Sequence, residues 1–192
     1  MRIIFLDIDG VIVPVSAWWG MNSLELDGLR QRADCRTMTA ILDRVDRQAV
    51  GRLQDLAQAA EACFVLHSSW RHSFREGFIR MFLEQAGLMD RFHPDWRCGP
   101  QLYKWTDIAG WLDGSDELVG PQDYIIIDDH ALFETAFGPI RNLSKPQKAM
   151  KARQIRPDGK IGFSENDLAQ ALALFGLSMI ERKQPEPISN DF

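Results

Sequence analysis

The segment IIFLDIDGVIV, residues 3–13, constrains the fold most, because two aspartates interrupt an otherwise apolar run. A continuous apolar run is typical of a strand in a parallel sheet whose two faces are both covered. Asp7 and Asp9 are two residues apart, so their side chains lie on the same side of an extended backbone. Burying two carboxylates is costly unless a cation or hydrogen bonds compensate for the lost hydration. The segment therefore predicts a buried strand that ends beside a positive group.

Strand-like runs alternate along the chain with segments of helical periodicity. Further strands are expected at CFVLH, residues 63–67, in DYIIIDDH, residues 123–130, and near residues 139–143. Four helices are expected: one capped by Asp46, one opened by a capping box of Ser73 and Glu76, one capped by Thr106, and one from Ser164 to Gly176. Such alternation predicts an α/β fold with a doubly wound, Rossmann-like parallel sheet.

The length of 192 residues fits one domain, which we expect to cover residues 1–180. Residues 14–45 mix Pro, Gly, Trp and charged residues without a regular period. We expect them to form an insertion after the first strand, a small flap or cap over one end of the sheet. The polar, Pro-containing residues 181–192 predict a disordered tail.

The composition favours a cytoplasmic protein with no membrane association. Hydrophobic residues make up 45% and charged residues 26%, and no apolar window reaches the roughly 20 residues of a membrane span. We also find no secretory signal pattern, and three cysteines without a CxxC pair favour neither a disulfide framework nor a zinc site. A net charge of −5 argues against general nucleic-acid coating but does not exclude a local basic groove. The basic residues within 144–160 either steer a polyanion toward the crevice or form a solvated basic face. The oligomeric state is not predicted.

Polar side chains follow three of the expected strands. In a doubly wound sheet the carboxyl ends of the strands meet at one crevice, so these side chains are expected to converge there. Several carboxylates in a small space call for a hard divalent cation, and oxygen ligands suit Mg²⁺. The candidates are Asp7 and Asp9, Ser68 and Ser69, Asp128 and Asp129, with Lys104 just ahead of an expected helix.

Four motifs carry a family resemblance. FLDIDGV, VLHSSWR, Lys104 and IIIDDH, in this order, resemble the four motifs of the haloacid dehalogenase (HAD) superfamily of phosphohydrolases. SSWR, KWTDIAGWL and IGFSENDLAQAL make the chain similar to the small HAD domains associated with bacterial RNA-repair and polynucleotide-processing proteins. The resemblance implies an HAD-like fold and a Mg²⁺-dependent phosphatase. Its expected substrate is a nucleic-acid end, a nucleotide or another large phosphorylated molecule, because the insertion is short for a full cap.

The resemblance implies roles for the four aspartates. Asp7 would be the nucleophile that forms an aspartyl phosphate, and it would also bind Mg²⁺. Asp9 would be the general acid and then the general base, and its backbone carbonyl would bind the metal. Asp128 would be a Mg²⁺ ligand, with Asp129 as a water-mediated ligand or a hydrogen-bonding partner of the ligands.

The second and third motifs supply the remaining catalytic candidates. Ser68 or Ser69 would hydrogen-bond the transferring phosphoryl group, and the resemblance leaves open which of them does so. Lys104 would neutralise charge on the nucleophile and the phosphate together.

Three further side chains are candidates for substrate contact. Arg71 could clamp a phosphate from the rim of the crevice, and a surface ion pair is the alternative. Trp18 and Trp19 lie on the expected flap, where they either stack on a substrate base or anchor the insertion to the core.

Two other functions share parts of this pattern. Phospho-acceptor receiver modules are also doubly wound, with acidic residues, a Ser or Thr and a Lys around Mg²⁺. Their adjacent acidic pair follows the first strand, however, whereas here DxD comes first and Asp128-Asp129 late. A non-catalytic HAD scaffold would require the loss of Asp7 or Asp9, and both are present.

Overall fold

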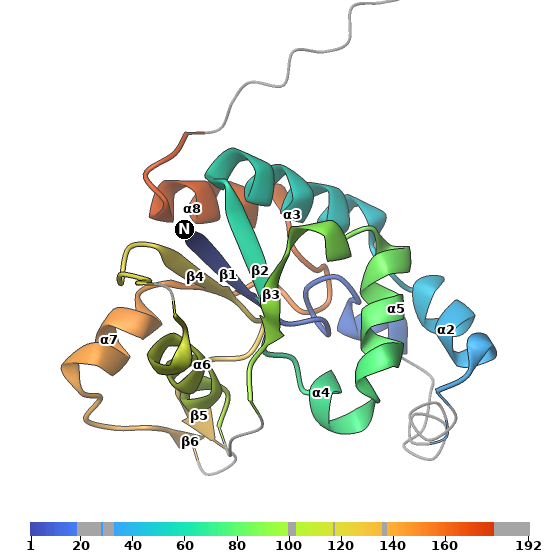
Figure 1. The fold of residues 1–192 in the computed structure, drawn as a ribbon, viewed down its shortest axis with the longest axis horizontal. Coiled ribbons are helices and arrows are strands. Elements are labelled where there is room, and N and C mark those ends of the chain that lie inside the picture. Colours follow the sequence, from blue (N-terminus) through green and yellow to red (C-terminus); the bar gives the residue numbers. More distant parts are fainter. Residues whose placement is uncertain (19–27, 29–32, 100–102, 117, 136–137, 179–192) are drawn as a thin grey trace, which may run out of the picture.

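The protein is an α/β domain built on a five-stranded, all-parallel sheet with helices on both faces (Figure 1). The computed structural model describes residues 1–18, 28, 33–99, 103–116, 118–135 and 138–178. The sheet order is β3-β2-β1-β4-β7, which confirms the predicted doubly wound, Rossmann-like architecture. The strands are β1 (Arg2–Leu6), β2 (Ala62–Leu66), β3 (Phe92–Arg97), β4 (Tyr124–Ile127) and β7 (Gln154–Ile155).

The helices form two layers. Figure 1 shows α3 and α8 on one side of the sheet and α6 and α7 on the other. The bounds are α2 (Cys35–Leu42), α3 (Arg47–Ala60), α4 (Trp70–Ser73), α5 (Glu76–Ala86), α6 (Lys104–Gly114), α7 (Lys145–Lys151) and α8 (Glu165–Leu174). Short 3-10 helices η1 (Val15–Trp18) and η2 (Met89–Arg91) and a small antiparallel pair, β5 (Glu134–Thr135) and β6 (Gly138–Pro139), complete the described elements.

Strand β1 lies at the centre of the core and is buried on both faces. Ile4 and Leu6 pack into the larger hydrophobic cluster, which includes side chains of α3, α5 and α8. Ile3 and Phe5 pack into the second cluster on the side of α6, where the Phe5 ring meets the edge of Trp111 at a centroid distance of 5.5 Å. This two-sided burial explains why the strand reads as a continuous apolar run.

The register of the sheet brings three strand ends level. Leu6 pairs with Leu66 of β2 and with Ile127 of β4. The ladder continues one step further, because the Asp7 N–H donates to the Ile127 carbonyl over 3.0 Å and the His67 N–H donates to the Leu6 carbonyl over 3.1 Å. The residues that follow β1, β2 and β4 therefore meet at one edge, as the sequence predicts.

The strongest helix signals are confirmed. The Asp46 carboxylate caps α3 by accepting from the backbone N–H groups of Gln48 at 2.8 Å and Ala49 at 3.2 Å. The Ser164 side chain likewise caps α8. Gly87 follows α5 in the left-handed conformation, with φ of 84°, as expected of a glycine just past a helix end.

Two predicted helix starts are wrong. Ser73 is the last residue of the short helix α4, and α5 begins at Glu76, so these two residues form no capping box. Thr106 lies inside the first turn of α6 rather than at its N-cap, and its hydroxyl accepts from the Tyr103 N–H over 3.3 Å. In both cases helical residues already precede the polar residue that the pattern marks as the start.

The edges of the sheet differ from the prediction. The strand expected near residues 139–143 is reduced to the two residues of β6, which pair with β5 outside the main sheet. The main sheet instead gains the edge strands β3 and β7, which the sequence analysis did not predict. Strand β3 contains a proline and has only two buried residues, and β7 has two residues in all, so neither carries an apolar strand pattern.

The expected insertion contains regular structure where it is described. Helix η1 follows the first motif, and α2 begins after the Asp34 side chain, which accepts from the Thr37 N–H over 2.8 Å. Trp19 and the expected tail, residues 181–192, lie outside the described residues. Within the described part of the chain, no helix combines the length and the apolar character needed to cross a membrane.

Replacing the cap of α3 tests this account of the fold. Asp46→Ala removes the acceptor for two backbone N–H groups and is expected to cost about 1 kcal/mol of unfolding free energy. Urea denaturation measures the loss, and Gln58→Ala, at an exposed position of the same helix, is the matched control. Equal stability of the Asp46→Ala and Gln58→Ala proteins would contradict the capping role.

Candidate active site

Lys104 connects two carboxylates at the ends of neighbouring strands. Asp7 follows β1 and Asp128 follows β4, and both side chains are almost fully buried. The Lys104 ammonium, on the first residue of α6, contacts Asp7 Oδ2 and lies 2.8 Å from Asp128 Oδ2. The positive group that the first motif called for is therefore present.

The three charges set one another's protonation. Burial alone would raise the pKa of Asp7, but Lys104, with help from His67 and the Ser68 hydroxyl, brings that pKa below its usual value. Burial and the charge of Asp7 raise the pKa of Asp128, outweighing Lys104. Burial opposes the charge on Lys104, yet the two carboxylates raise its pKa above the ordinary value, so it stays protonated. The carboxyl groups of Asp7 and Asp128 share the single positive charge of Lys104, so the site can accept a further cation.

His67 follows β2 and is buried beside this centre. Its Nδ1 lies 3.7 Å from Asp128 Oδ2, and neither ring nitrogen has a hydrogen-bond partner among the described residues. Burial and the neighbouring Lys104 ammonium lower the pKa of His67 to about 3. The imidazole is therefore neutral near pH 7 and adds no positive charge to the site.

Asp129 occupies a narrow space between two glycines. A Cβ atom on Gly10 would lie 2.3 Å from Asp129 Cγ, and one on Gly159 would lie 2.5 Å from Asp129 Oδ2. Gly10 also has a φ of 72°, which favours glycine. These positions therefore need glycine if Asp129 is to keep its place.

The exposed His130 places a ring nitrogen beside the acidic centre. Its Nδ1 lies 2.8 Å from Asp129 Oδ1, and its backbone N–H donates to Asp128 Oδ1 over 2.9 Å. One ligand atom from each of Asp128, Asp129 and His130 lies within 4.8 Å of the others, a group that could hold a metal ion. The sequence predicts the two aspartates as ligands but does not include His130 in the metal site.

Asp9 lies on the turn after β1, and two indoles hold its carboxylate. Asp9 Oδ1 accepts from Trp18 Nε1 over 3.2 Å, and Asp9 Oδ2 accepts from Trp70 Nε1 over 2.8 Å. Trp18 thus contacts a residue of the first motif. Its predicted stacking on a substrate base stays a prediction. Trp70 was not among the predicted site residues, although it lies inside the SSWR motif.

The two serines of the second motif have different surroundings. Ser68 is fully buried, and its hydroxyl helps to lower the pKa of Asp7 by hydrogen bonding. Its Oγ also accepts from the Trp70 N–H over 3.4 Å. Ser69 is exposed at the start of α4. The structure therefore brings Ser68, and not Ser69, into contact with the Asp7 carboxylate.

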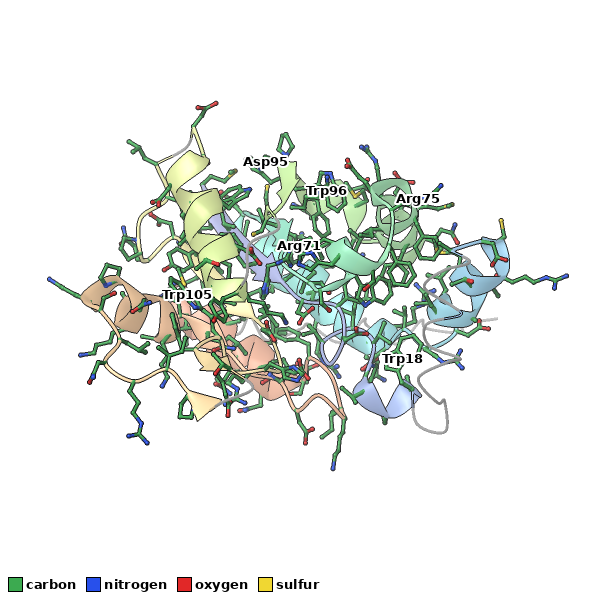
Figure 2. All side chains as sticks on the ribbon, turned by 90° about the horizontal axis from the view of Figure 1, so that it is seen from below. Trp18, Arg71, Arg75, Asp95, Trp96 and Trp105 are labelled. Atoms are coloured by element: carbon green, nitrogen blue, oxygen red, sulfur yellow. The ribbon has the colours of Figure 1, made fainter. Side chains whose placement is uncertain are left out.

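The Arg71 side chain forms an ion pair, the alternative expected from the sequence, but the pair lies in the interior and not at the surface. The guanidinium donates to the Ser68 carbonyl over 2.7 Å, to the His67 carbonyl, and to Asp107 Oδ2 of α6. Its side chain is only 4% exposed, and Figure 2 shows it toward the middle of the molecule, with Trp18 near the lower edge of the view. Arg71 ties residues 67–69, which we call the serine loop, to α6. Its predicted contact with substrate stays a prediction.

Asp107 is the partner that sequence reasoning missed. It lies three residues after Lys104, on the same face of α6, so one helix supplies both the lysine of the acidic centre and the anchor for Arg71. The sequence signal for this role was an aspartate one turn after Lys104 within KWTD, on the buried face of a helix, where an apolar residue is expected.

The class of protein follows from three features: the order of the parallel sheet, the DxD motif after β1, and the contact of Lys104 with Asp7 and Asp128. Together they are typical of a domain of the HAD superfamily. Over residues 3–168 the chain matches the family model described as the HAD domain in Swiss Army Knife RNA repair proteins, and it belongs to this family. The resemblance expected from the sequence is thereby confirmed. Comparisons with curated proteins and with solved structures gave no significant match.

Removing the charge of Asp128 is expected to stabilise the metal-free protein. An acid whose pKa is raised in the folded state loses stability as pH rises from its unfolded pKa through its folded pKa. Asp128→Asn avoids that loss, so its gain over the wild type in chelator should be near zero at pH 4 and reach roughly 1–2 kcal/mol at pH 8. Thermal unfolding across this range measures it, with exposed Asp116→Asn as control. A gain that does not depend on pH would refute the assignment.

Breaking the buried pair between Arg71 and Asp107 should loosen the serine loop. Asp107→Leu leaves the guanidinium without its carboxylate and is expected to cost roughly 3–5 kcal/mol. Hydrogen exchange at the amides of residues 68–71 should accelerate. The double variant Arg71→Leu/Asp107→Leu should recover part of the stability, because no buried charge remains. No recovery would mean that the carboxylate acts independently of Arg71.

Proposed function

We propose that the protein is a metal-dependent phosphatase that acts through an aspartyl phosphate on phosphorylated nucleic-acid ends or nucleotides. The observation that carries the proposal is the contact of Lys104 with both Asp7 and Asp128 at the carboxyl ends of adjacent strands. The family supports HAD-type chemistry. Phosphoryl transfer depends mainly on positioning and on neutralising charge, which this arrangement provides.

The first half of the reaction transfers the phosphoryl group to the protein. An Asp7 carboxylate oxygen attacks phosphorus, and the bond from phosphorus to the leaving oxygen breaks. Asp9 gives a proton to that oxygen, which departs as an alcohol. Lys104 stabilises the negative charge shared by Asp7 and the phosphoryl oxygens. Ser68, which contacts Asp7, is our candidate for a hydrogen bond to the phosphoryl group.

The second half returns the protein to its starting state. Asp9 now accepts a proton from a water molecule, whose oxygen attacks the phosphorus of the aspartyl phosphate. The bond between phosphorus and the Asp7 oxygen breaks, inorganic phosphate leaves, and Asp7 is again a carboxylate. Asp9 keeps the proton for the next leaving group, so the cycle balances.

The donor set of the site fits a divalent cation such as Mg²⁺. The buried carboxylates of Asp7 and Asp128 share one ammonium group, and the nearly buried Asp129 carboxylate lies beside Asp128; oxygen ligands suit this metal. Asp7, Asp128 and the backbone carbonyl of Asp9 would hold the ion, with Asp129 and His130 beside it. Mg²⁺ bound there would supply positive charge for the phosphoryl oxygens.

A polyanionic substrate fits the surface next to the acidic centre. Arg156 and Lys160 are exposed. Arg156 Nη2 lies 3.5 Å from the Asp129 carbonyl, and Lys160 follows Gly159, which adjoins the Asp129 carboxylate. Helix α7 adds three exposed cations, Lys145, Lys148 and Lys151. Arg153 does not contribute, because its guanidinium donates to three backbone carbonyls. The description of the family as RNA-repair domains points the same way.

Phosphate release by the purified protein tests this function. The substrates are p-nitrophenyl phosphate, a 5′-nucleotide and oligonucleotides with a 3′- or 5′-phosphate, each with Mg²⁺ and with chelator. We expect metal-dependent turnover that Asp7→Asn abolishes, Lys104→Met lowers about 10²–10³-fold, and the control Asp116→Asn leaves unchanged. Preference for an oligonucleotide would favour end repair over nucleotide hydrolysis.

The alternatives predict different results in the same experiment. A receiver-like module would accept phosphate on an aspartate and keep it, so a phosphoprotein would accumulate without turnover. A non-catalytic HAD domain would bind the phosphorylated ligand and Mg²⁺ but release no phosphate. Either result would overturn the phosphatase proposal.

A further inference from the structure

Both carboxylate oxygens of Asp9 are held by side chains that come from separate parts of the chain. Trp18 lies nine residues after Asp9 on η1, and Trp70 lies 61 residues after it on α4. The indole N–H of each tryptophan donates to a different oxygen of the same carboxylate. We call this arrangement of Asp9, Trp18 and Trp70 the indole clamp.

The Trp70 side of the clamp is held rigidly. Trp70 is 4% exposed, and its ring packs between Phe74 at 4.9 Å and Phe82 at 4.8 Å, measured between ring centroids. Its backbone N–H donates to Ser68 Oγ, which also interacts with Asp7. The only polar side-chain atom of this buried tryptophan therefore points at Asp9.

The Trp18 side of the clamp is fixed by a different set of contacts. The guanidinium of Arg44 lies over the Trp18 ring, 5.6 Å from its centroid, and Arg44 Nε donates to the Ala17 carbonyl over 3.1 Å. The other end of η1 is tied to the C-terminal loop, because the Val15 N–H donates to the Gly159 carbonyl over 2.7 Å. Two independent anchors thus converge on one carboxylate.

Indole donors suit a carboxylate that must gain and lose a proton. The indole N–H only donates and carries no charge, so it fixes the carboxyl plane without pairing it with a cation. A carboxylate offers about four lone-pair directions, and the two indoles occupy two of them. The indoles therefore orient the carboxyl group without competing as bases for its proton.

We infer that Trp18 and Trp70 are positioning residues that hold the carboxyl group of Asp9 toward the leaving-group oxygen. This inference rests on the proposed phosphatase function. Without the two donors the carboxyl group loses one hydrogen bond at each oxygen, and proton transfer to the leaving group loses part of its geometry. The rest of the site, including Asp7 and Lys104, does not depend on either indole N–H.

The dependence of kcat/KM on the leaving group distinguishes the positioning of Asp9 from a purely structural role of the tryptophans. An alcohol leaves poorly unless it is protonated, whereas p-nitrophenol leaves as a stable anion without an acid. The parameter kcat/KM reports the half-reaction in which the leaving group departs. We therefore compare kcat/KM for a 5′-nucleotide and for p-nitrophenyl phosphate in the wild type and in Trp18→Phe, Trp70→Phe and Asp9→Asn.

The matched control removes an indole N–H elsewhere. Trp111 is 5% exposed and donates to the Asp95 carbonyl over 2.9 Å, so Trp111→Phe mimics the packing change without touching Asp9. We expect Trp70→Phe and Trp18→Phe to lower kcat/KM on the nucleotide about 10–100-fold and on the aryl ester less than about threefold, with the same selectivity in Asp9→Asn. Equal losses on both substrates, or none, would overturn the inference.

A spectroscopic measurement keeps the inference testable if a variant folds poorly or the wild type is inactive. The chain has six tryptophans, so a ¹⁵N spectrum shows at most six indole N–H signals. Asp9→Asn should move the signals of Trp18 and Trp70 and leave that of Trp111 in place. Unmoved Trp18 and Trp70 signals would overturn the clamp. A wild type that releases no phosphate from either ester or from the phosphorylated oligonucleotides, with these signals moved, would overturn the phosphatase proposal instead.

Discussion

Asp7 and Asp128 can share one edge of the sheet because the Lys104 ammonium lies between their carboxylates. The level register of Leu6 and Ile127 forces the two acids close together, and the core on both faces leaves little water to separate them. Their repulsion would otherwise oppose the pairing of β1 with β4, the centre of the fold. The lysine relieves part of that repulsion, and what remains favours a further cation.

Helix α6 connects two parts of the site that are far apart in sequence, the acidic centre and the serine loop. Its first residue, Lys104, reaches the acidic centre, and Asp107, one turn later, holds Arg71 and through it the carbonyls of the serine loop. A displacement of α6 therefore moves both groups together. The buried position of Arg71 means that the loop is shaped by the body of the domain and not by a surface contact.

The central strands, two of the helix caps and the acidic strand ends could be predicted because each follows from local sequence. Asp46 and Ser164 cap their helices, and the run ending in Asp128 is buried on both faces. The edge strands β3 and β7 could not, since they are polar or very short and depend on pairing with a neighbour.

Contacts between residues far apart in sequence could not be predicted from local sequence either. Arg71 was expected at a rim because its partner, Asp107, lies 36 residues away in KWTDIAGWL, and neither motif indicates that the two residues pair. The meeting of Trp70 with Asp9 likewise depends on the sheet order, which places β2 beside β1.

The two glycines that enclose Asp129 have a consequence for synthesis of the chain. A ribosome-bound chain that has reached His130 contains all four motifs, yet Gly159 and strand β7 have not emerged. Until they do, β4 is an open sheet edge and Asp129 lacks one of its walls, so the centre is completed only after residues 154–159 have emerged.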